Sequence, residues 1–576
     1  MPAPAPAAIP ATASSIFDTR SHQMFPILEP AEIERVRRFG QVRSYAAGEA
    51  LAQVGSVGHL MIILSGKVDV SRRDQSGGQV PIVTHGPGSF MGELAQLAGR
   101  PALVDAHAQG PVEALIMPPD RLRALLIAEA ELGERIMRAL ILRRIGLLET
   151  GAGGPIIVGR LENPDVLRLQ GFLRRNGHPH QRLDPETDAE AKALIERFHV
   201  DPGQLPIVLC PGGQLLRNPG EDELARCIGL VRAIDPDRVY DVAIVGAGPA
   251  GLAAAVYAAS EGLSALVLDC RAFGGQAGAS SRIENYLGFP TGITGIALMA
   301  RAYNQAQKFG AEMAIPDQVV ALRRGDGGSD DFVLTLVNNE HARARAVVIA
   351  SGAYYRRLDV ENLEAFEGAS VHYWASPFEA KLCAGQDVAL VGGGNSAGQA
   401  AVYLASQAAK VWIIVRTADL NARMSRYLVD RIAGLPNVEV VTRARVSALE
   451  GHDGVLEAIR WRQGDKEVRR ALKQLFLFIG AAPHTDWLAG SGVELDAKGF
   501  VLTGTDAAGD CRALETSLRG VFAIGDVRAG SVKRVAAAVG EGAQVVATLH
   551  TFLATRAAAP AIAAPAIAAP AVAARV

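Results

Sequence analysis

Two glycine-rich loops, each directly after an apolar run, carry the residues of this sequence best suited to chemistry. They are Gly246-Ala-Gly248-Pro-Ala-Gly251 and Gly392-Gly-Gly394-Asn395-Ser396-Ala-Gly398. In such a loop the first glycine permits a tight turn, the second lets the backbone approach a pyrophosphate, and the third allows a helix to pack on a strand. A strand pattern precedes each loop and an alanine-rich helix pattern follows it. The sequence therefore predicts two dinucleotide-binding sites.

The residue that ends the next strand in each unit indicates which dinucleotide is preferred. Asp269 follows Gly246 by 23 residues and can accept hydrogen bonds from a ribose diol. Arg416 follows Gly392 by 24 residues and can accommodate a 2′-phosphate. This pattern predicts FAD at the first site and NADPH at the second. The alternatives are that Asp269 caps the following loop and that Arg416 is a solvated surface charge.

Length and composition predict a soluble, cytoplasmic protein with several domains. The chain has 576 residues, 58 basic and 60 acidic side chains and a net charge of -2. This balance favours neither nucleic acid nor an anionic membrane as a partner. The N-terminus lacks the pattern of a signal peptide, and prolines interrupt the long uncharged run near the C-terminus.

The five cysteines show neither a C-x-x-C pair nor a metal-like spacing with histidine. They are Cys210, Cys227, Cys270, Cys383 and Cys511. Scattered cysteines of this kind are expected to be core residues, and no metal site is predicted. The Ala/Pro-rich ends, residues 1–20 and 556–576, are expected to be flexible tails.

From Asp241 onward, over about 310 residues, the sequence resembles the low-molecular-weight thioredoxin reductases. The resemblance implies that Gln276 and Asn285 contact the isoalloxazine, that Asp526 contacts the ribityl chain, and that the nicotinamide domain is inserted in the flavin domain. The blocks that carry it are Gly274-Gly275-Gln276, Ser281 to Pro290, Val347 to Gly352, Phe476 to Pro483, Gly520 to Asp526 and Lys533 to Gly542.

The last of these blocks predicts a helix whose N-terminus and cations, Lys533 and Arg534, face the part of the flavin where negative charge collects on reduction. A solvated helix start is the alternative. The residues assigned to FAD are Gly246, Gly248, Gly251, Asp269, Gly275, Gln276, Asn285, Gly525, Asp526, Arg534 and Val535. The residues assigned to NADPH are Gly392, Gly394, Asn395, Ser396, Arg416 and Arg423.

The sequence departs from that family where the redox C-x-x-C is expected. The corresponding stretch is Val371 to Phe378, in which Trp374 and Pro377 occupy the two cysteine positions. Electrons therefore cannot leave the flavin through an internal disulfide at this place, and the flavin must reduce an acceptor directly. Tyr373 and Trp374 are the candidate catalytic residues, stacked near the isoalloxazine. Ordinary packing is the alternative for both aromatic side chains.

The second nucleotide site also departs from the family, because its cationic cluster is reduced to Arg416. Arg423 and Arg426 are expected to supply the missing charge. If they do not, discrimination between NADPH and NADH is modest.

Residues 21–150 resemble a cyclic-nucleotide-binding domain, with turns at Gly48, Gly55 and Gly66 and a characteristic segment from Gly86 to Ala102. The resemblance implies that Glu93 accepts from a ribose hydroxyl and that Arg100 pairs with a cyclic phosphate. Gly92, Leu94, Pro101 and Ala102 complete the expected ligand segment. Leu103 replaces a hydroxyl residue, so the alternative is a ligand-free barrel used for packing or dimer formation.

Residues 151–235 resemble a thioredoxin-like domain, with Pro206 as the cis-proline that enters a strand. Gly159 to Asp165 stands where the redox dithiol is expected, and Cys210 is too isolated to replace it. The sequence therefore favours a spacer or docking role for this domain.

The predicted fold is multidomain, with a β-barrel cyclic-nucleotide-binding-like domain, an α/β thioredoxin-like domain and two Rossmann-like α/β dinucleotide-binding domains. The expected boundaries are 21–150, 151–235, 236–355 with 485–555 for FAD, and 356–484 for NAD(P)H. The predicted function is an NADPH-dependent FAD oxidoreductase, regulated by a cyclic nucleotide and assembled as a homodimer. Its acceptor, a small molecule or a carrier protein, stays unidentified. The alternatives are a non-turnover sensor acting through a partner and a disulfide reductase that uses other cysteines.

Overall fold

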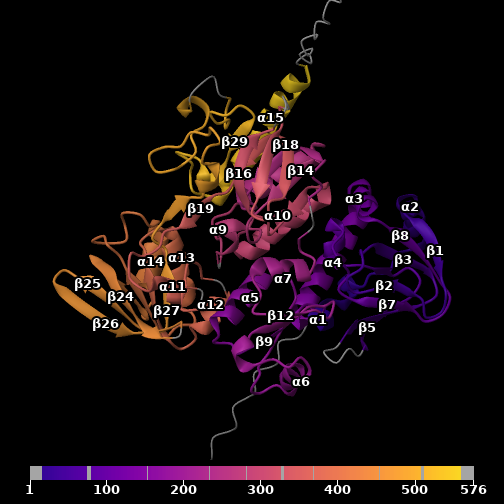
Figure 1. Cartoon of the computed structure of the whole chain (residues 1–576), viewed down its shortest axis with the longest axis horizontal. Helices are drawn as coiled ribbons and strands as arrows, with labels where there is room; N and C mark the ends of the chain where they lie inside the picture. The colour runs from indigo at the N-terminus through magenta and orange to yellow at the C-terminus, as the bar shows by residue number, and fades with distance from the viewer. Residues whose placement is uncertain are drawn as a thin grey trace, which may run out of the picture.

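The computed structural model describes residues 16–73, 79–151, 153–231, 234–280, 282–325, 330–367, 369–375, 377–452, 454–507 and 512–558. Figure 1 shows four units in chain order, coloured from indigo to yellow. Most of the two expected tails lies outside the described residues. However, helix α1 begins at Ile16 and helix α15 continues to Ala558. Both helices therefore extend into segments that composition had assigned to flexible tails.

The first unit contains two antiparallel four-stranded sheets, in the orders β1-β8-β3-β6 and β2-β7-β4-β5. Side chains of β3 alternate, so that Met61 and Ile63 join the core between the sheets and Leu60 and Ile62 pack toward helices α3 and α4. Its elements are α1 (Ile16–Met24), α2 (Pro30–Val36), β1 (Gln41–Tyr45), β2 (Ala50–Ala52), β3 (Leu60–Ser65), β4 (Val68–Arg73), β5 (Gln79–His85), β6 (Phe90–Met91), a 3-10 turn at Leu94–Ala98, β7 (Asp105–Ala108), β8 (Val112–Met117), α3 (Pro119–Ala128) and α4 (Ala130–Thr150).

The second unit is a four-stranded sheet of order β10-β9-β11-β12 with helices α5, α6 and α7. Strands β9 and β10 are parallel, whereas β11 runs antiparallel to both β9 and β12. The Leu205–Pro206 peptide bond directly before β11 is cis, as expected. Its elements are β9 (Ile156–Val158), α5 (Pro164–Arg175), β10 (Gln181–Leu183), α6 (Ala189–Arg197), β11 (Ile207–Leu209), β12 (Leu215–Arg217) and α7 (Glu221–Cys227).

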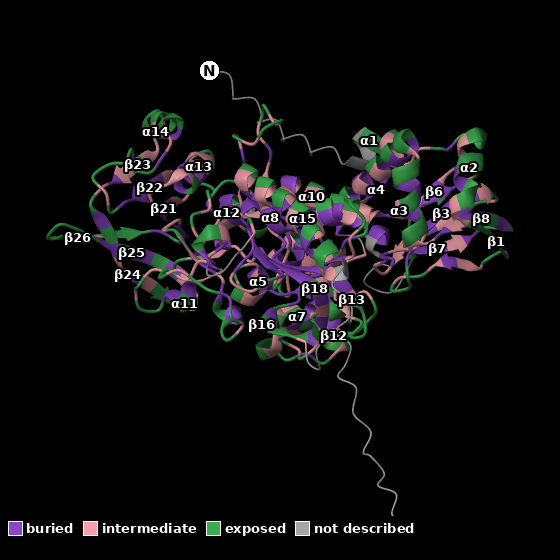
Figure 2. Ribbon diagram, turned by 90° about the horizontal axis from the view of Figure 1, so that it is seen from above, coloured by how far each residue is buried: buried purple, intermediate pink, exposed green. Residues whose placement is uncertain are grey.

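The third unit is a seven-stranded sheet of order β15-β14-β13-β18-β17-β16, in which β29 pairs with the end of β18. Figure 2 shows its buried central strands β13 and β18 beneath helices α8, α10 and α15. Its elements are β13 (Val239–Val245), α8 (Pro249–Ser260), β14 (Ala265–Leu268), α9 (Gly275–Gly278), α10 (Gly295–Phe309), β15 (Glu312–Ala314), β16 (Val319–Arg324), β17 (Phe332–Leu336), β18 (His341–Ile349), β29 (Val521–Ala523) and α15 (Val535–Ala558).

The fourth unit is inserted between β18 and β29 of the third. Its parallel sheet has the order β20-β27-β21-β22-β23, and a meander of β24, β25 and β26 packs against it. Strands β19 (Ala353–Tyr355) and β28 (Ala481–Pro483) pair where the chain enters and leaves. Its other elements are α11 (Leu363–Phe366), β20 (Val371–His372), α12 (Pro377–Leu382), β21 (Asp387–Val391), α13 (Asn395–Leu404), β22 (Lys410–Ile414), α14 (Arg426–Ala433), β23 (Val438–Val441), β24 (Ala444–His452), β25 (Val455–Gln463), β26 (Lys466–Ala471) and β27 (Gln474–Leu477).

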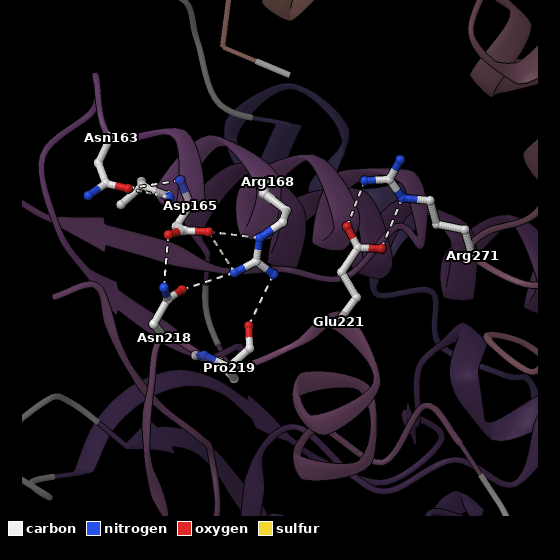
Figure 3. A network of polar contacts seen from close by, with 8 residues as sticks. Asn163, Asp165, Arg168, Asn218, Pro219, Glu221 and Arg271 are labelled. Carbon is white, nitrogen blue, oxygen red and sulfur yellow. Dashed lines mark hydrogen bonds and ion pairs between the residues drawn. The ribbon is translucent and has the colours of Figure 1, made fainter. Parts of the chain in front are cut away.

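The second unit contacts the other three. Figure 1 shows it between the first unit and helix α12 of the fourth. Glu221 at the start of α7 accepts two hydrogen bonds, of 2.9 and 2.6 Å, from the guanidinium of Arg271 in the third unit (Figure 3). Asn176 also donates to the carbonyl of Arg271, at 3.0 Å. A bidentate arginine–carboxylate pair fixes geometry as well as charge, so this contact orients the second unit on the third.

Candidate functional site

The first glycine loop follows β13 and is shaped by close backbone packing. Gly246 has a φ of 116°, and a Cβ there would lie 2.2 Å from the carbonyl oxygen of Ala350. A Cβ on Gly251 would lie 1.9 Å from the carbonyl oxygen of Gly246. Since neither separation is possible for a real Cβ, both positions require glycine for packing and turn geometry.

The middle glycine of this loop faces open space. A Cβ on Gly248 would have only the Cα of Gly275 within 4 Å, at 3.9 Å. Gly248 precedes Pro249, the first residue of α8, so free amides of a helix N-terminus lie beside that space. The protein itself gives no steric reason for glycine here, and a closely approaching diphosphate gives one. The loop therefore fits a dinucleotide.

Asp269 has a structural role that was only the alternative expectation. Its carboxylate accepts from the amide of Ala247, at 2.9 Å, and from the amides of Arg271 and Ala272, at 3.1 and 3.3 Å. The side chain thus caps the loop after β14 and holds the glycine loop in place. This capping interpretation is correct, and contact with a ribose remains a prediction.

The segment expected to embrace a flavin lies next to the first glycine loop. Gly274 and Gly275 have φ values of 102 and 51°, and Gly274 donates from its amide to the carbonyl of Ala247, at 2.7 Å. The Gln276 amide donates to the carbonyl of Ala353, the first residue of β19. Asn285 is exposed. The structure therefore brings Gly275 and Gln276 to the loop and leaves the Asn285 side chain at the surface.

The C-terminal block places Asp526 directly after β29, in a short turn that includes Gly525. Burial raises the pKa of Asp526 above its usual range. The amide of Gly525 donates to Glu541 at 2.6 Å. Lys533 donates to the carbonyl of Asp526 and to Ser531 Oγ, so this cation braces the turn. Helix α15 begins at Val535, and Arg534 is exposed.

The second glycine loop repeats the geometry of the first. Gly392 has a φ of 141°, and a Cβ there would lie 2.2 Å from the carbonyl oxygen of Phe478. A Cβ on Gly394 would meet nothing within 4 Å, whereas one on Gly398 would lie 2.8 Å from Met424 Sδ. The open middle position again lies at the start of a helix, α13, where the loop fits a second dinucleotide.

The other residues assigned to the second site differ in their surroundings. Asn395 accepts from the amide of Ser425, at 2.6 Å, and so joins the starts of α13 and α14. Ser396, Arg416 and Arg423 are exposed. Arg426 pairs with Asp430 on its own helix, at 2.9 Å. This exposed pair does not test the expectation that Arg426 supplies charge to the second site, which stays a prediction.

Comparison with known proteins agrees with this geometry. The pyridine nucleotide-disulphide oxidoreductase family matches residues 240–542. The chain belongs to this family. A thioredoxin reductase of Mycoplasmopsis pulmonis is 33% identical over 312 residues, which cover 53% of this chain and 95% of that protein. The crystal structure of a T. acidophilum thioredoxin reductase matches with a TM-score of 0.50 and 29% identity, over 55% of this chain and 100% of that one.

The match covers two of the four units, and a second family covers the first unit. The cyclic nucleotide-binding domain family matches residues 42–129. The NADPH-dependent thioredoxin reductase 3 of Arabidopsis thaliana is 34% identical over 317 residues, or 53% of this chain and 56% of that protein. This oxidoreductase is thus a thioredoxin reductase-like, FAD-dependent enzyme with an N-terminal cyclic nucleotide-binding domain.

The segment that departs from the thioredoxin reductases lies between units of this oxidoreductase. The backbone of Ala375 forms a bridge with Ser280, close in sequence to Gln276. Trp374 donates from its indole nitrogen to Glu379, at 2.9 Å, and the Arg175 guanidinium lies 3.6 Å from the centre of its ring. Trp374 is therefore covered by helix α5 of the second unit.

Tyr373 does not share this environment. Its hydroxyl donates to Glu367, which also pairs with Arg357, and its ring packs against the core of the fourth unit. These contacts favour the alternative interpretation, packing, for Tyr373, and a catalytic role for this residue stays a prediction.

In the cyclic nucleotide-binding domain, the expected ligand segment and the residue before β3 contain buried polar atoms without a hydrogen-bond partner. They are Glu93 Oε1, Gln96 Oε1 and His59 Nδ1. The other Glu93 oxygen lies 3.4 Å from Arg144 Nη1, and both side chains are about nine-tenths buried. Because buried polar groups are normally paired, these atoms fit a polar ligand.

The rest of this segment contacts helix α4 of its own unit and residues of the two neighbouring units. Gly92 has a φ of 141°, and its carbonyl accepts from Arg143 at 2.9 Å. Leu94 is half-buried and Ala102 is buried. Arg100 donates to the hydroxyl of Tyr303 in the third unit, at 2.6 Å. Pro101 Cγ lies 2.8 Å from where a Cβ on Gly229 of the second unit would stand.

Two of the cysteines are bonded to each other, which their spacing in the sequence did not predict. Cys210, directly after β11, and Cys227, the last residue of α7, form a disulfide with a Cα–Cα distance of 6.1 Å. The sheet and helix bring together two residues whose separation of 17 matches no motif. Cys270 is exposed and Cys383 is buried, both as free thiols. Cys511 lies outside the described residues.

The described part of the chain contains no group of His, Cys, Asp and Glu that could hold a metal ion. It also contains no helix whose length and apolar character would allow it to cross a membrane.

Sequence reasoning missed the residues that act between units. Arg175 and Tyr303 lie on helices whose sequences have an ordinary amphipathic pattern. The residues around them in the sequence do not indicate which residues of other units they contact. Arg443, Arg445 and Arg462, which line a cavity with Arg416, left a weak signal. The repeats Arg443-Ala-Arg445 and Arg460-Trp-Arg462 alternate with the period of a strand, but only the register shows which arginines face each other.

Proposed function

We propose that this chain is an NADPH-dependent FAD oxidoreductase whose reduced flavin passes electrons directly to an acceptor outside the reductase units. The observation that best supports this proposal is the position of Trp374. It occupies the place where the relatives' redox dithiol is expected, and the Arg175 guanidinium packs on its ring. A bound flavin would accept a hydride from the nicotinamide and hold both electrons for the acceptor. The chain supplies binding, orientation and charge rather than a titrating nucleophile.

The residues of the two glycine loops support this assignment. Space at Gly248 and Gly394 lets the amides of α8 and α13 reach the two diphosphates. Asp269 fixes the first loop through three backbone amides. Asp526, whose pKa is raised by burial, lies at the same carboxyl edge of the sheet and is proposed to bind the ribityl chain.

We further propose the domain boundaries stated from the sequence, and a rotation of the fourth unit about its two connections. The antiparallel pairing of β19 with β28 supports this hinge, because the chain enters and leaves the fourth unit through these two short strands. The strand order, the parallel and antiparallel pairings and cis-Pro206 support a thioredoxin-like domain at residues 151–235. Asn163 caps α5 where that fold would carry a dithiol.

A disulfide reductase is the second candidate function. The Cys210–Cys227 disulfide favours it, because a reducible pair exists in the unit that packs against the third. In this scheme the two flavin electrons and two protons would convert the disulfide to two thiols. Oxidation of those thiols by a partner's disulfide would restore it.

Anaerobic stopped-flow absorbance tests the proposed function. NADPH should bleach the flavin band near about 450 nm, an expectation from flavin chemistry. Replacement of Cys210 and Cys227 by serine should leave bleaching and acceptor turnover unchanged under the first scheme and abolish turnover under the second. Absence of bleaching with either NADPH or NADH would instead favour a non-turnover sensor.

We also propose a cyclic nucleotide as the ligand of the first domain, since Glu93, Gln96 and His59 present buried polar atoms without partners. Titration calorimetry of the full chain with cyclic AMP and cyclic GMP tests this.

The homodimer and a cytoplasmic location also remain proposals. The 93% exposure of Leu287, beside half-buried Tyr286, is consistent with a covered surface in an assembly, which sedimentation would detect.

A further inference from the structure

A pocket of about 410 Å³ lies where β22 and β24 approach each other, beside the second glycine loop. Four arginines line it: Arg416, Arg443, Arg445 and Arg462. Its position follows from two contacts. The amide of Arg443 donates to the carbonyl of Thr417, at 2.9 Å, and a Cβ on Gly393 would lie 4.0 Å from Thr417 Oγ1.

The meander places two of these arginines directly against each other. Arg445 on β24 is the register partner of Arg462 on β25, and both are exposed on the same face. Like charges in directly opposite positions destabilise an antiparallel pair. A ligand with concentrated negative charge would remove that repulsion.

Two acidic residues of the meander, Glu450 and Glu467, are already engaged by other partners. Glu450 accepts from Arg460 and from Arg469, the latter at 2.8 Å. Glu467 lies 3.6 Å from Arg460 and accepts from Ser447, at 3.2 Å. Among the described residues, no acidic side chain pairs with any of the four pocket arginines.

The backbone also commits Arg443 to this pocket. Its φ of 52° lies in the left-handed region, which residues with a Cβ rarely adopt. Hydrogen bonds of 2.9 Å from Arg443 to Thr417 and from Ala444 to Val415 hold the backbone on both sides of this conformation. The backbone therefore has an uncommon left-handed conformation at Arg443, a residue that lines the pocket.

We propose that this pocket binds a phosphomonoester dianion, the group that distinguishes NADPH from NADH. The inference rests on the proposed function. It replaces Arg423 and Arg426 with residues of the meander as the partners of Arg416. Guanidinium forks match the oxygens of a phosphate in geometry and charge.

The test compares the double variant Arg445→Gln/Arg462→Gln with the matched control Arg469→Gln, on the same meander. In flavin reduction the double variant should raise the KM for NADPH about tenfold or more, with the KM for NADH unchanged and the control near wild type. Equal changes for both nucleotides, or none, would overturn the assignment to NADPH.

A second readout does not depend on the reductase. Calorimetry of the full chain with 2′-AMP should show binding that the double variant loses and that adenosine, which lacks the phosphate, does not reproduce. Binding of 2′-AMP or inorganic phosphate, lost in the double variant while the KM for NADPH stays constant, would support a separate phosphorylated ligand. No binding of 2′-AMP or phosphate by the wild type would overturn the site.

A different observation carries a second inference, about Arg100. Its guanidinium donates to Tyr303 on α10 and lies 5.9 Å from the centre of that ring. Tyr303 stacks on Phe273, with ring centres 4.4 Å apart and planes 21° apart. Phe273 immediately precedes Gly274, which donates to Ala247 of the first glycine loop. Contacts therefore run without a gap from the ligand segment of the first unit to the flavin loop.

We infer that an anionic ligand of the first unit and Tyr303 compete for Arg100, so that ligand binding releases α10 and the loop at Phe273. The Tyr303→Phe variant removes the competing hydroxyl and keeps the stacked ring. It should bind cyclic AMP or cyclic GMP more tightly, by about threefold to tenfold. The nucleotide's effect on the rate of flavin reduction should shrink.

The matched control is Tyr257→Phe, on α8 of the same unit, whose side chain is 41% exposed. It should leave both the Kd and the nucleotide effect unchanged. An unchanged Kd in Tyr303→Phe, or no binding of either cyclic nucleotide by the wild type, would overturn the competition.

Discussion

The guanidinium of Arg175 lies 3.6 Å from the ring centre of Trp374 and joins helix α5 of the second unit to the fourth unit. Arg174, the preceding residue, interacts electrostatically with Glu379, which accepts from the Trp374 indole at 2.9 Å. Pro164 at the other end of α5 approaches the turn at Gly454, with Cγ 3.0 Å from the position of a Cβ there. Helix α5 therefore holds the fourth unit from both of its ends.

This contact predicts that Arg175→Gln frees the fourth unit to rotate. A partly buried cation–π contact contributes about 1 to 2 kcal/mol, and about 1.4 kcal/mol corresponds to tenfold in a population. If the fourth unit must rotate out of the observed orientation before hydride transfer, weakening this contact should accelerate flavin reduction by up to about tenfold. Stopped-flow absorbance measures the rate. Arg197→Gln on α6 is the control, and a slower Arg175→Gln would show that the contact promotes transfer.

The disulfide gives a prediction on stability. Cys210 and Cys227 close a loop across a separation of 17 residues, and a loop of that size corresponds to about 3 kcal/mol of unfolding free energy. The double serine variant should lose about that amount in urea denaturation without reductant. Reductant should lower wild-type stability to the same level. Cys270→Ser, at an exposed free thiol, should change little. Equal stability of the double variant and wild type would mean that the native chain is reduced.

The glycine loops could be predicted from sequence because their requirement is local: a strand, a turn and a helix start lie within a dozen residues. The contact between Arg100 and Tyr303 joins residues 203 positions apart. It depends on how two folded units pack, and no periodicity records that. The resemblance to thioredoxin reductases showed that Trp374 occupies a cysteine position of that family. It could not predict that Arg175 packs on Trp374, because Arg175 belongs to a unit outside the resemblance.

The same distinction explains the other differences. Asp269 ends a strand beside a glycine loop whether it binds a ribose or backbone amides, so type and spacing could not separate the two roles. Arg426 was expected to add charge beside Arg416, and sequence alone did not show that helical spacing also gives it Asp430 as a partner one turn away. The pocket arginines became apparent only from the strand register that sets Arg445 against Arg462.

Buried histidines predict that acid destabilises the junction between the first and second units. Burial, together with the charges of Arg144 and Arg100, lowers the pKa of His178 to about 3, and burial lowers the pKa of His180 to about 4. The unfolded chain, with a histidine pKa of about 6.5, binds these protons first as the pH falls. Stability is therefore complete above about pH 6.5 and declines below it, by about 2 kcal/mol per histidine at about pH 5.

Urea denaturation between about pH 7 and 5 measures this decline. The His178→Gln variant should have a shallower slope than wild type, because it removes one proton uptake on unfolding. His341→Gln, at an exposed residue, should follow the wild-type slope. Identical slopes for His178→Gln and wild type would show that His178 is protonated alike in both states.

Two glycines of the first loop should differ in their effects when replaced by alanine: one replacement should lower stability and the other should weaken cofactor binding. Gly251→Ala places a Cβ 1.9 Å from the Gly246 carbonyl oxygen and should cost about 2 kcal/mol or more in unfolding free energy. Gly248 has a φ of -77° and open space at its Cβ position, so Gly248→Ala should fold with near wild-type stability. Its methyl group would instead enter the space assigned to the diphosphate, and the purified protein should contain markedly less flavin.

Absorbance of the purified variants at the flavin band measures their flavin content, and denaturation of the flavin-free proteins measures their stability. Gly394→Ala is the matched variant at the second loop, where a Cβ would also meet nothing within 4 Å. It should retain full flavin but show a raised KM for NADPH, since its methyl group would approach the other diphosphate. If Gly248→Ala keeps full flavin content, the open space at that position is not where the diphosphate lies, and the assignment of the first loop fails.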